Sequence, residues 1–222
     1  ISTEDAEGVM ERFRARLEGV FKEVKEADGE DDSYRKVPFY PAKLGRDQGT
    51  AISRETMQLI ADAQVTYPEG FAVHPKVLPQ MQRRAEAIMN GPIDWATAEL
   101  LAFGSLLMEG RTVRLTGQDS RRGTFSQRFA AVVDRNTNEE YIPLKHLTDD
   151  QGQFHVFDSL LSEYAVMGFE YGYSVASPQS LVLWEGQFGD FANGAQTISD
   201  EFFSSGDAKW TQKSGVTLLL PH

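Results

Sequence analysis

Apolar residues recur at the spacing of an α-helix over residues 2–26. Those on the apolar side are Ala6, Val9, Met10, Phe13, Leu17, Val20, Phe21 and Val24. Ser2 or Thr3 stands where a hydroxyl could cap the first turn. Residues 1–30 are therefore predicted to form an amphipathic helix followed by an acidic linker.

A connector with short helices is predicted over residues 31–92. It begins charged and becomes rich in proline and aromatic residues, without a sustained period. Short helical patterns then cover residues 53–64 and 75–89, each with Ser or Pro near its start. We expect these helices to be packing elements rather than carriers of a site.

From residue 93 onward, helical and strand patterns alternate. Asp94 is placed to cap a helix that Gly110 ends, and an apolar strand follows at residues 112–116. Further strands are predicted at 180–186 and 216–221, and helices near 161–171 and 191–203. Short apolar strands separated by helices are typical of a parallel sheet covered on both faces. Residues 93–222 are therefore predicted to form an α/β domain whose ligands bind at the carboxyl ends of the strands.

The composition excludes several classes of function. The chain has 33 acidic and 22 basic residues, and the resulting net charge of −11 disfavours a nucleic-acid surface. It has no cysteine, so disulfides, thiolate metal sites and a catalytic thiol are excluded. No run reaches the ~20 apolar residues of a membrane span, and the acidic start is unlike a signal peptide. A soluble, cytoplasmic protein is expected.

Three polar loops are predicted to meet at the carboxyl ends of the strands. They are "TGQDSRRGTFSQRF", "DSLLSE" and "EGQFGDFANGAQ", which mix glycine with polar and aromatic residues. Glu163 opens a helix of small and aromatic residues, where a buried carboxylate needs a partner. That partner is either a ligand or ordinary protein, since the helix dipole also favours an acidic residue in a first turn.

Other common kinds of site are not supported by the sequence. The histidines His74, His146, His155 and His222 are scattered, which argues against a Ser-His-acid set and against a histidine metal site. No G-x-S-x-G, G-x-G-x-x-G or Walker sequence occurs. The acidic "DGEDD" of the linker lacks the spacing of a calcium loop. No metal site is predicted in this chain.

Three segments resemble one enzyme family. They are "WATAELLAFGSLLMEGRTVRLTGQDSRRGTFSQRF", "LLSEYAVMGFEYGYSVASPQSLVLWEGQFGDFANGAQTISDEFFSSGDAKW" and "LLLPH". They resemble the thiamine-diphosphate-dependent 2-oxoglutarate dehydrogenases, the first, decarboxylating component of that complex. The resemblance runs from about residue 35 to the end and is dense from residue 93. It implies a three-layer, parallel-sheet domain of the pyrimidine type, which binds the aminopyrimidine ring of thiamine diphosphate.

The resemblance also assigns roles to particular residues. Glu163 of "LSE" would be the catalytic carboxylate that hydrogen-bonds the pyrimidine N1′ and shares its proton. Phe188 and Phe191 of "QFGDF" would hold the ring, although both also suit an ordinary core. Gln118 and Asp119 of "GQDSRRGTF" match polar positions near the cofactor.

Three further positions in the same loop complete the comparison. Arg121 and Arg122 could serve substrate carboxylates or only a domain interface, and the interface is favoured. Phe129 stands where the family often has a histidine, so this chain departs from the family at a position that could take part in substrate handling.

Part of the implied site lies outside this chain. The family's Gly-Asp-Gly sequence followed by Asn, which holds Mg²⁺ and the diphosphate, is absent, so the Mg²⁺ ligands are expected elsewhere. The start without Met and the final β-type run also indicate a piece of a longer protein. The implied partners are 2-oxoglutarate, a lipoyl-bearing succinyltransferase component and a second subunit, because the two half-sites meet across a homodimer.

The implied function is oxidative decarboxylation of 2-oxoglutarate, with succinyl transfer to a lipoyl group, in the tricarboxylic acid cycle. One alternative is the same chemistry on 2-oxoadipate, since the groups that read substrate length could lie outside the segment. The other is a non-catalytic module that keeps the fold. The presence of Glu163, Phe188 and Phe191 argues against such a module.

Overall fold

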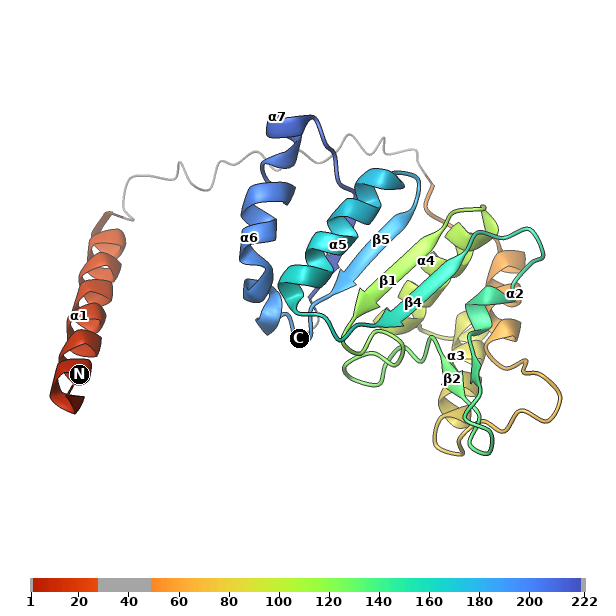
Figure 1. The fold of residues 1–222 in the computed structure, drawn as a ribbon. Helices are drawn as coiled ribbons and strands as arrows, with labels where there is room; N and C mark the ends of the chain where they lie inside the picture. Colours follow the sequence, from red (N-terminus) through yellow and green to blue (C-terminus); the bar gives the residue numbers. More distant parts are fainter. Residues whose placement is uncertain (1, 28–48, 221–222) are drawn as a thin grey trace. The chain divides into compact units, whose positions relative to one another are not determined.

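A computed structural model of the chain describes residues 2–27 and 49–220 (Figure 1). It contains two compact units, Ile1–Thr50 and Ala51–His222. In the first unit, helix α1 (Thr3–Ala27) confirms the predicted amphipathic helix. The Ser2 hydroxyl accepts from the Asp5 backbone N–H at 3.1 Å, and the Asp5 carboxylate accepts from the Ser2 N–H at 3.1 Å. The "DGEDD" stretch lies outside the described residues.

The second unit begins with three helices. They are α2 (Arg54–Ala63), α3 (Leu78–Asn90) and α4 (Trp95–Met108). Ser53 caps α2, and Asp94 caps α4 by accepting from the Thr97 N–H at 2.8 Å, as the sequence predicts. Ile60 of α2 and Ile88 of α3 belong to the same buried cluster as α4. The division of the chain at residues 30 and 92 stays a prediction.

The centre of this unit is a four-stranded sheet in the order β4-β1-β5-β6. Its strands are β1 (Val113–Gly117), β4 (Phe154–Asp158), β5 (Leu181–Glu185) and β6 (Val216–Leu219), and every pairing is parallel. The strands at β1, β5 and β6 are confirmed. Strand β4 was not predicted, because its exposed end and its place at the sheet edge give "FHVFD" no continuous apolar run.

Helices cover both faces of the sheet, so the predicted three-layer α/β architecture is confirmed. Leu115 and Leu183 pack in the core beneath α4. Trp184, the next residue along β5, points to the opposite face and packs with Met167 of α5 (Glu163–Ala176). This alternation follows from the two-residue period of a strand. In Figure 1, α4 and α5 lie on opposite sides of the strands.

The remaining elements are short. They are β2 (Val132–Val133), β3 (Glu140–Tyr141), η2 (Pro143–Lys145), η3 (Asp190–Ala195), α6 (Gln196–Ile198), η4 (Ser199–Phe203) and α7 (Gly206–Trp210). The helix predicted near 191–203 is therefore three consecutive pieces of 3-10, α and π geometry. Within the described ranges, no helix combines the length and the apolar character needed to cross a lipid bilayer.

Candidate functional site at the carboxyl ends of the strands

The carboxyl ends of β1, β4 and β5 lie at one end of the sheet (Figure 1). The loops that leave them comprise residues 118–131, 159–162 and 186–189, and η3 follows the last of these. The Ser159 N–H donates to the Gly117 carbonyl at 2.7 Å, which joins the loop after β4 to the end of β1. The topology thus brings together the three loops that the sequence singled out.

Glu163 and Gln118 meet across this end of the sheet. Glu163 is the first residue of α5, and Ser162 caps that helix. The Gln118 amide, Nε2, donates to Glu163 Oε1 at 2.8 Å. Among the described residues, Oε2 has no hydrogen-bond donor. The glutamate is therefore held by one oxygen and presents the other for a further interaction.

The backbone at Gly194 lies against the Glu163 side chain. A Cβ atom at position 194 would lie 3.3 Å from Glu163 Cβ and 3.4 Å from Oε2. The carbon–carbon distance of 3.3 Å is shorter than ordinary carbon contacts of roughly 3.5–4.0 Å. Glycine at this position lets η3 approach the carboxylate without displacing it.

Asp119 has two partners of its own and does not join the Glu163 pair. It accepts from Gln187 Nε2 at 3.1 Å and forms an ion pair with Arg122 at 3.1 Å. Because Gln187 follows β5, Asp119 joins the loops after β1 and β5. Gln187 was not singled out from the sequence, since amides give no pattern that marks a partner 68 positions away.

The two arginines of this loop both bind carboxylates of the same chain. Arg122 pairs with Asp119, as described. The Arg121 N–H donates to Asp158 Oδ1 at 2.9 Å, and its guanidinium pairs with Glu140 of the β2–β3 hairpin. These contacts connect β4 to the hairpin. The predicted role of the arginines at a domain interface stays a prediction.

Two aromatic side chains border the same loops. Phe188 has a left-handed backbone (φ 56°) and contacts the Phe125 ring edge to face, with centroids 5.5 Å apart. Its side chain is 40% exposed, and that of Phe191 in η3 is 51% exposed. Neither ring is buried in the core, which was the alternative that the sequence left open for both. Exposed rings at a polar loop are available to stack on a flat ligand.

Arg128 is the most heavily bonded side chain of this region. Its guanidinium lies between Glu99 of α4 and Glu185, the last residue of β5, and all three side chains are nearly buried. Burial lowers the pKa of Arg128, but hydrogen bonds and charges from Glu185 and Glu99 outweigh it and raise that pKa above its ordinary value. Arg128 is thus a permanent cation. The neighbouring Phe129 is half-buried with φ 48°.

The expectation of a buried carboxylate in α5 applies to Glu170 rather than to Glu163. Glu170 is 0% exposed, whereas Glu163 is half-buried. Arg114 of β1 donates to both Glu170 oxygens, at 2.7 and 2.9 Å. The Arg114 guanidinium also lies over the rings of Phe157, Phe169 and Tyr173, at 4.7–5.1 Å. The partner of this carboxylate is ordinary protein, and it was missed because Arg114 is 56 positions away.

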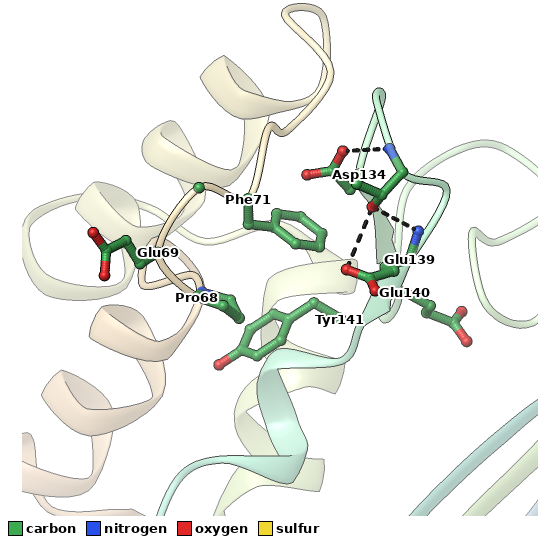
Figure 2. A pocket seen from close by; sticks show the side chains of 9 residues that line it. Pro68, Glu69, Phe71, Asp134, Glu139, Glu140 and Tyr141 are labelled. Atoms are coloured by element: carbon green, nitrogen blue, oxygen red, sulfur yellow. Dashed lines mark hydrogen bonds between the residues drawn. The ribbon is translucent and has the colours of Figure 1, made fainter.

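A cavity of about 490 Å³ lies away from these loops (Figure 2). It is bordered by Phe71, Tyr141 and several carboxylates. Asp134, the most buried of these, accepts from the backbone N–H groups of Ala72, Asn136 and Thr137, which lower its pKa. That carboxylate thus stabilises a turn. Among the described residues, no group of three or more His, Cys, Asp or Glu side chains is placed to share a metal ion.

The fold and the loops at its strand ends define a class of protein. Residues 91–222 match the family described as transketolase, pyrimidine binding domain, and the chain belongs to this family. Two relatives from Mycobacterium sp. (strains JLS and KMS) are 50% identical over 232 residues, and one from Mycolicibacterium vanbaalenii is 49% identical. Each is named multifunctional 2-oxoglutarate metabolism enzyme. The matches cover 100% of this chain and 18% of each relative's length.

Proposed function

We propose that this chain is the pyrimidine-binding part of a thiamine-diphosphate-dependent enzyme that decarboxylates 2-oxoglutarate. The observation that carries the proposal is the Glu163 carboxylate, held by Gln118 through one oxygen and open at the other. It stands at the carboxyl ends of parallel strands, where α/β sheets bind ligands. The similarity to enzymes named for 2-oxoglutarate metabolism supports the substrate.

The residues present fit the aminopyrimidine ring. The ring is flat and apolar on its faces and carries nitrogen atoms at its edge. Phe188 and Phe191 offer exposed aromatic surface for the faces, and Glu163 offers a carboxylate oxygen for a ring nitrogen. Gln118 and Asp119 fix the loop that borders this space. We infer that these five residues form the cofactor half-site.

Each residue then has a defined task. When bound, thiamine diphosphate supplies the carbanion stabilisation that decarboxylation of a 2-oxo acid requires. Glu163 holds a proton between Oε2 and the ring nitrogen N1′, and so sets the protonation of the pyrimidine. Gln118 keeps the carboxylate in place by donating to Oε1. The phenylalanines orient the ring and exclude water from its faces.

The rest of the active site belongs to parts of the protein outside this chain. We propose that the ligands of Mg²⁺ and the diphosphate lie there, and that a second subunit of a homodimer completes the site. The acyl product would pass to the lipoyl group of a succinyltransferase component, within the tricarboxylic acid cycle in the cytoplasm. Because this chain matches 18% of the length of each relative, most of such a protein lies outside the match and is long enough to supply these functions.

The proposal is tested by 2-oxoglutarate-dependent reduction of an artificial electron acceptor by the full-length protein. Parent and Glu163→Gln are compared with saturating thiamine diphosphate and Mg²⁺, and cofactor binding is followed by near-ultraviolet circular dichroism. We expect Glu163→Gln to lower kcat by about 10²–10⁴-fold while the cofactor still binds. Near-parental kcat would remove Glu163 from the chemistry.

Two alternatives are separated by the same assays. Competition between 2-oxoglutarate and 2-oxoadipate gives the ratio of their kcat/KM values, which decides between the two substrates. A parent protein without any circular dichroism response to thiamine diphosphate and Mg²⁺ would indicate a non-catalytic module.

A further inference from the structure

Arg128 uses every hydrogen-bond donor that a guanidinium has. Nε and Nη2 donate to the Glu99 carboxylate at 2.6 and 3.2 Å. Nη1 and Nη2 donate to the Glu185 carboxylate at 2.7 and 2.9 Å. Nη1 also donates to the Ser120 carbonyl at 3.0 Å. These five bonds fix the guanidinium in one orientation, which only the planar fork of arginine can satisfy.

Two of the three partners of Arg128 lie in or directly before the loops that carry Gln118, Asp119 and Phe188. Ser120 comes two residues after Gln118, and Glu185 comes three residues before Phe188. The two loops start from paired strand ends, because Gly117 of β1 pairs with Glu185 of β5 and a Cβ atom on Gly117 would lie 2.5 Å from the Glu185 carbonyl oxygen. The third partner, Glu99, lies on α4, which packs in the core cluster with β1 and β5.

A second arginine supports the backbone at Arg128. Arg84 of α3 donates to the Arg128 carbonyl at 2.7 Å and to the Gln127 carbonyl at 2.5 Å. Arg84 is itself buried, and burial lowers its pKa. The loop 118–131 is therefore held by side chains from α3, α4 and β5. This loop has little regular structure of its own, so these contacts determine its conformation.

We propose that Arg128 is a positioning residue of the cofactor half-site. By joining Ser120 to Glu185 it sets the distance between the loops, and thereby places Gln118 and its partner Glu163 opposite Phe188. This inference rests on the proposed function. Arg128 itself would contact neither the cofactor nor the substrate. Cofactor affinity, and not only stability, would nevertheless depend on this residue, which is 4% exposed.

Arg128→Lys and the matched control Arg114→Lys test the inference in the full-length protein. Lysine keeps the charge but cannot span two carboxylates. Arg114 also binds a buried glutamate through two bonds, yet its partners Glu170, Phe157, Phe169 and Tyr173 lie outside both loops. Both substitutions replace a buried guanidinium that holds a glutamate, so a loss of cofactor affinity confined to Arg128→Lys would not be a general effect of disturbing a buried pair.

The readouts are the KM for thiamine diphosphate, kcat at saturating cofactor, and near-ultraviolet titration with thiamine diphosphate and Mg²⁺. We expect Arg128→Lys to weaken cofactor binding about tenfold in both measurements, with a smaller change in kcat. Arg114→Lys should bind the cofactor like the parent. Equal affinities in the two arginine variants would overturn the positioning role.

Two further outcomes are decisive. If Arg128→Lys does not give folded protein by far-ultraviolet circular dichroism, Glu185→Gln takes its place, because it weakens the connection from Ser120 through Arg128 to Glu185 and keeps the two hydrogen bonds to Glu99. Parental cofactor affinity in Glu185→Gln would then refute the inference. If the parent neither binds the cofactor nor turns over, the proposed function fails and the positioning role fails with it. If the parent binds the cofactor and Arg128→Lys binds it with the same affinity, the positioning role alone is rejected.

Discussion

The same substitution should lower the free energy of unfolding far more at Glu170 of α5 than at Glu163 of the same helix. Glu170→Gln leaves the Arg114 cation in a site where its side chain is 13% exposed, without a counter-charge. Removing one partner of a buried ion pair costs about 3–5 kcal/mol. The glutamine can still accept one hydrogen bond, and the three aromatic rings still face the guanidinium. We therefore expect the free energy of unfolding to fall by about 3 kcal/mol.

Urea unfolding of the 222-residue chain, followed by tryptophan fluorescence, measures this loss. Trp184 is 2% exposed and packs beside α5, so it reports on the region affected. With a urea dependence of about 2 kcal/mol/M, the midpoint should fall by about 1.5 M. Glu163→Gln is the matched control on the same helix. Because Glu163 is half-buried, Glu163→Gln should lower the free energy of unfolding by less than about 0.5 kcal/mol.

A double substitution tests the cause of the loss. If the unpaired charge is responsible, Arg114→Met together with Glu170→Met should be more stable than Glu170→Gln alone, since a buried pair can be replaced by apolar residues at little cost. A double variant as unstable as Glu170→Gln, or equal midpoints for Glu170→Gln and Glu163→Gln, would refute the argument.

Two further substitutions test the helix cap at Asp94 and the position of the Glu163 carboxylate. Asp94→Ala should lower the free energy of unfolding by about 1 kcal/mol at pH 7, measured by urea unfolding. Hydrogen bonding by Thr97 lowers the pKa of Asp94 below its ordinary 3.8. The stability difference between parent and Asp94→Ala should therefore be complete above about pH 4 and vanish as the pH falls through the lower folded-state pKa. A stability difference that does not depend on pH would contradict the role of the Asp94 carboxylate as the cap. Gly194→Ala should lower acceptor reduction by the full-length protein about tenfold, because the added Cβ displaces Glu163. Gly172→Ala is the control, since its Cβ meets no atom within 4 Å; equal activities of the two alanine variants would exclude the displacement.

The sequence predicted the elements whose signals are local. Caps such as Asp94 and continuous apolar runs such as 181–185 depend on neighbouring residues, and the structure has them where expected. Strand β4 was missed because its stability comes from parallel pairing with β1, which no local pattern of Phe154–Asp158 reports.

The candidate site also combines residues that the sequence marks locally with contacts that only the fold creates. Gln118 and Glu163 were both singled out, but their hydrogen bond joins positions 45 apart and emerges only in the fold. Glu170 was passed over for its neighbour Glu163, because burial of a helical residue depends on which element covers it. The ion pairs of Arg114 and Arg128 follow from topology, and a single sequence contains no signal that pairs those charges.

The strand order also governs how this chain reaches its folded state. Val113 pairs with Phe154 and Leu181, roughly 40 and 70 residues further along the chain. Closing such loops costs entropy before any strand pairing is gained, and no hairpin within the sheet can nucleate it. We therefore expect the helices to form first and the assembly around β1 to be the slow step of folding. Until β4 and β5 arrive, both edges of β1 expose unpaired backbone, the kind of surface through which nascent chains associate.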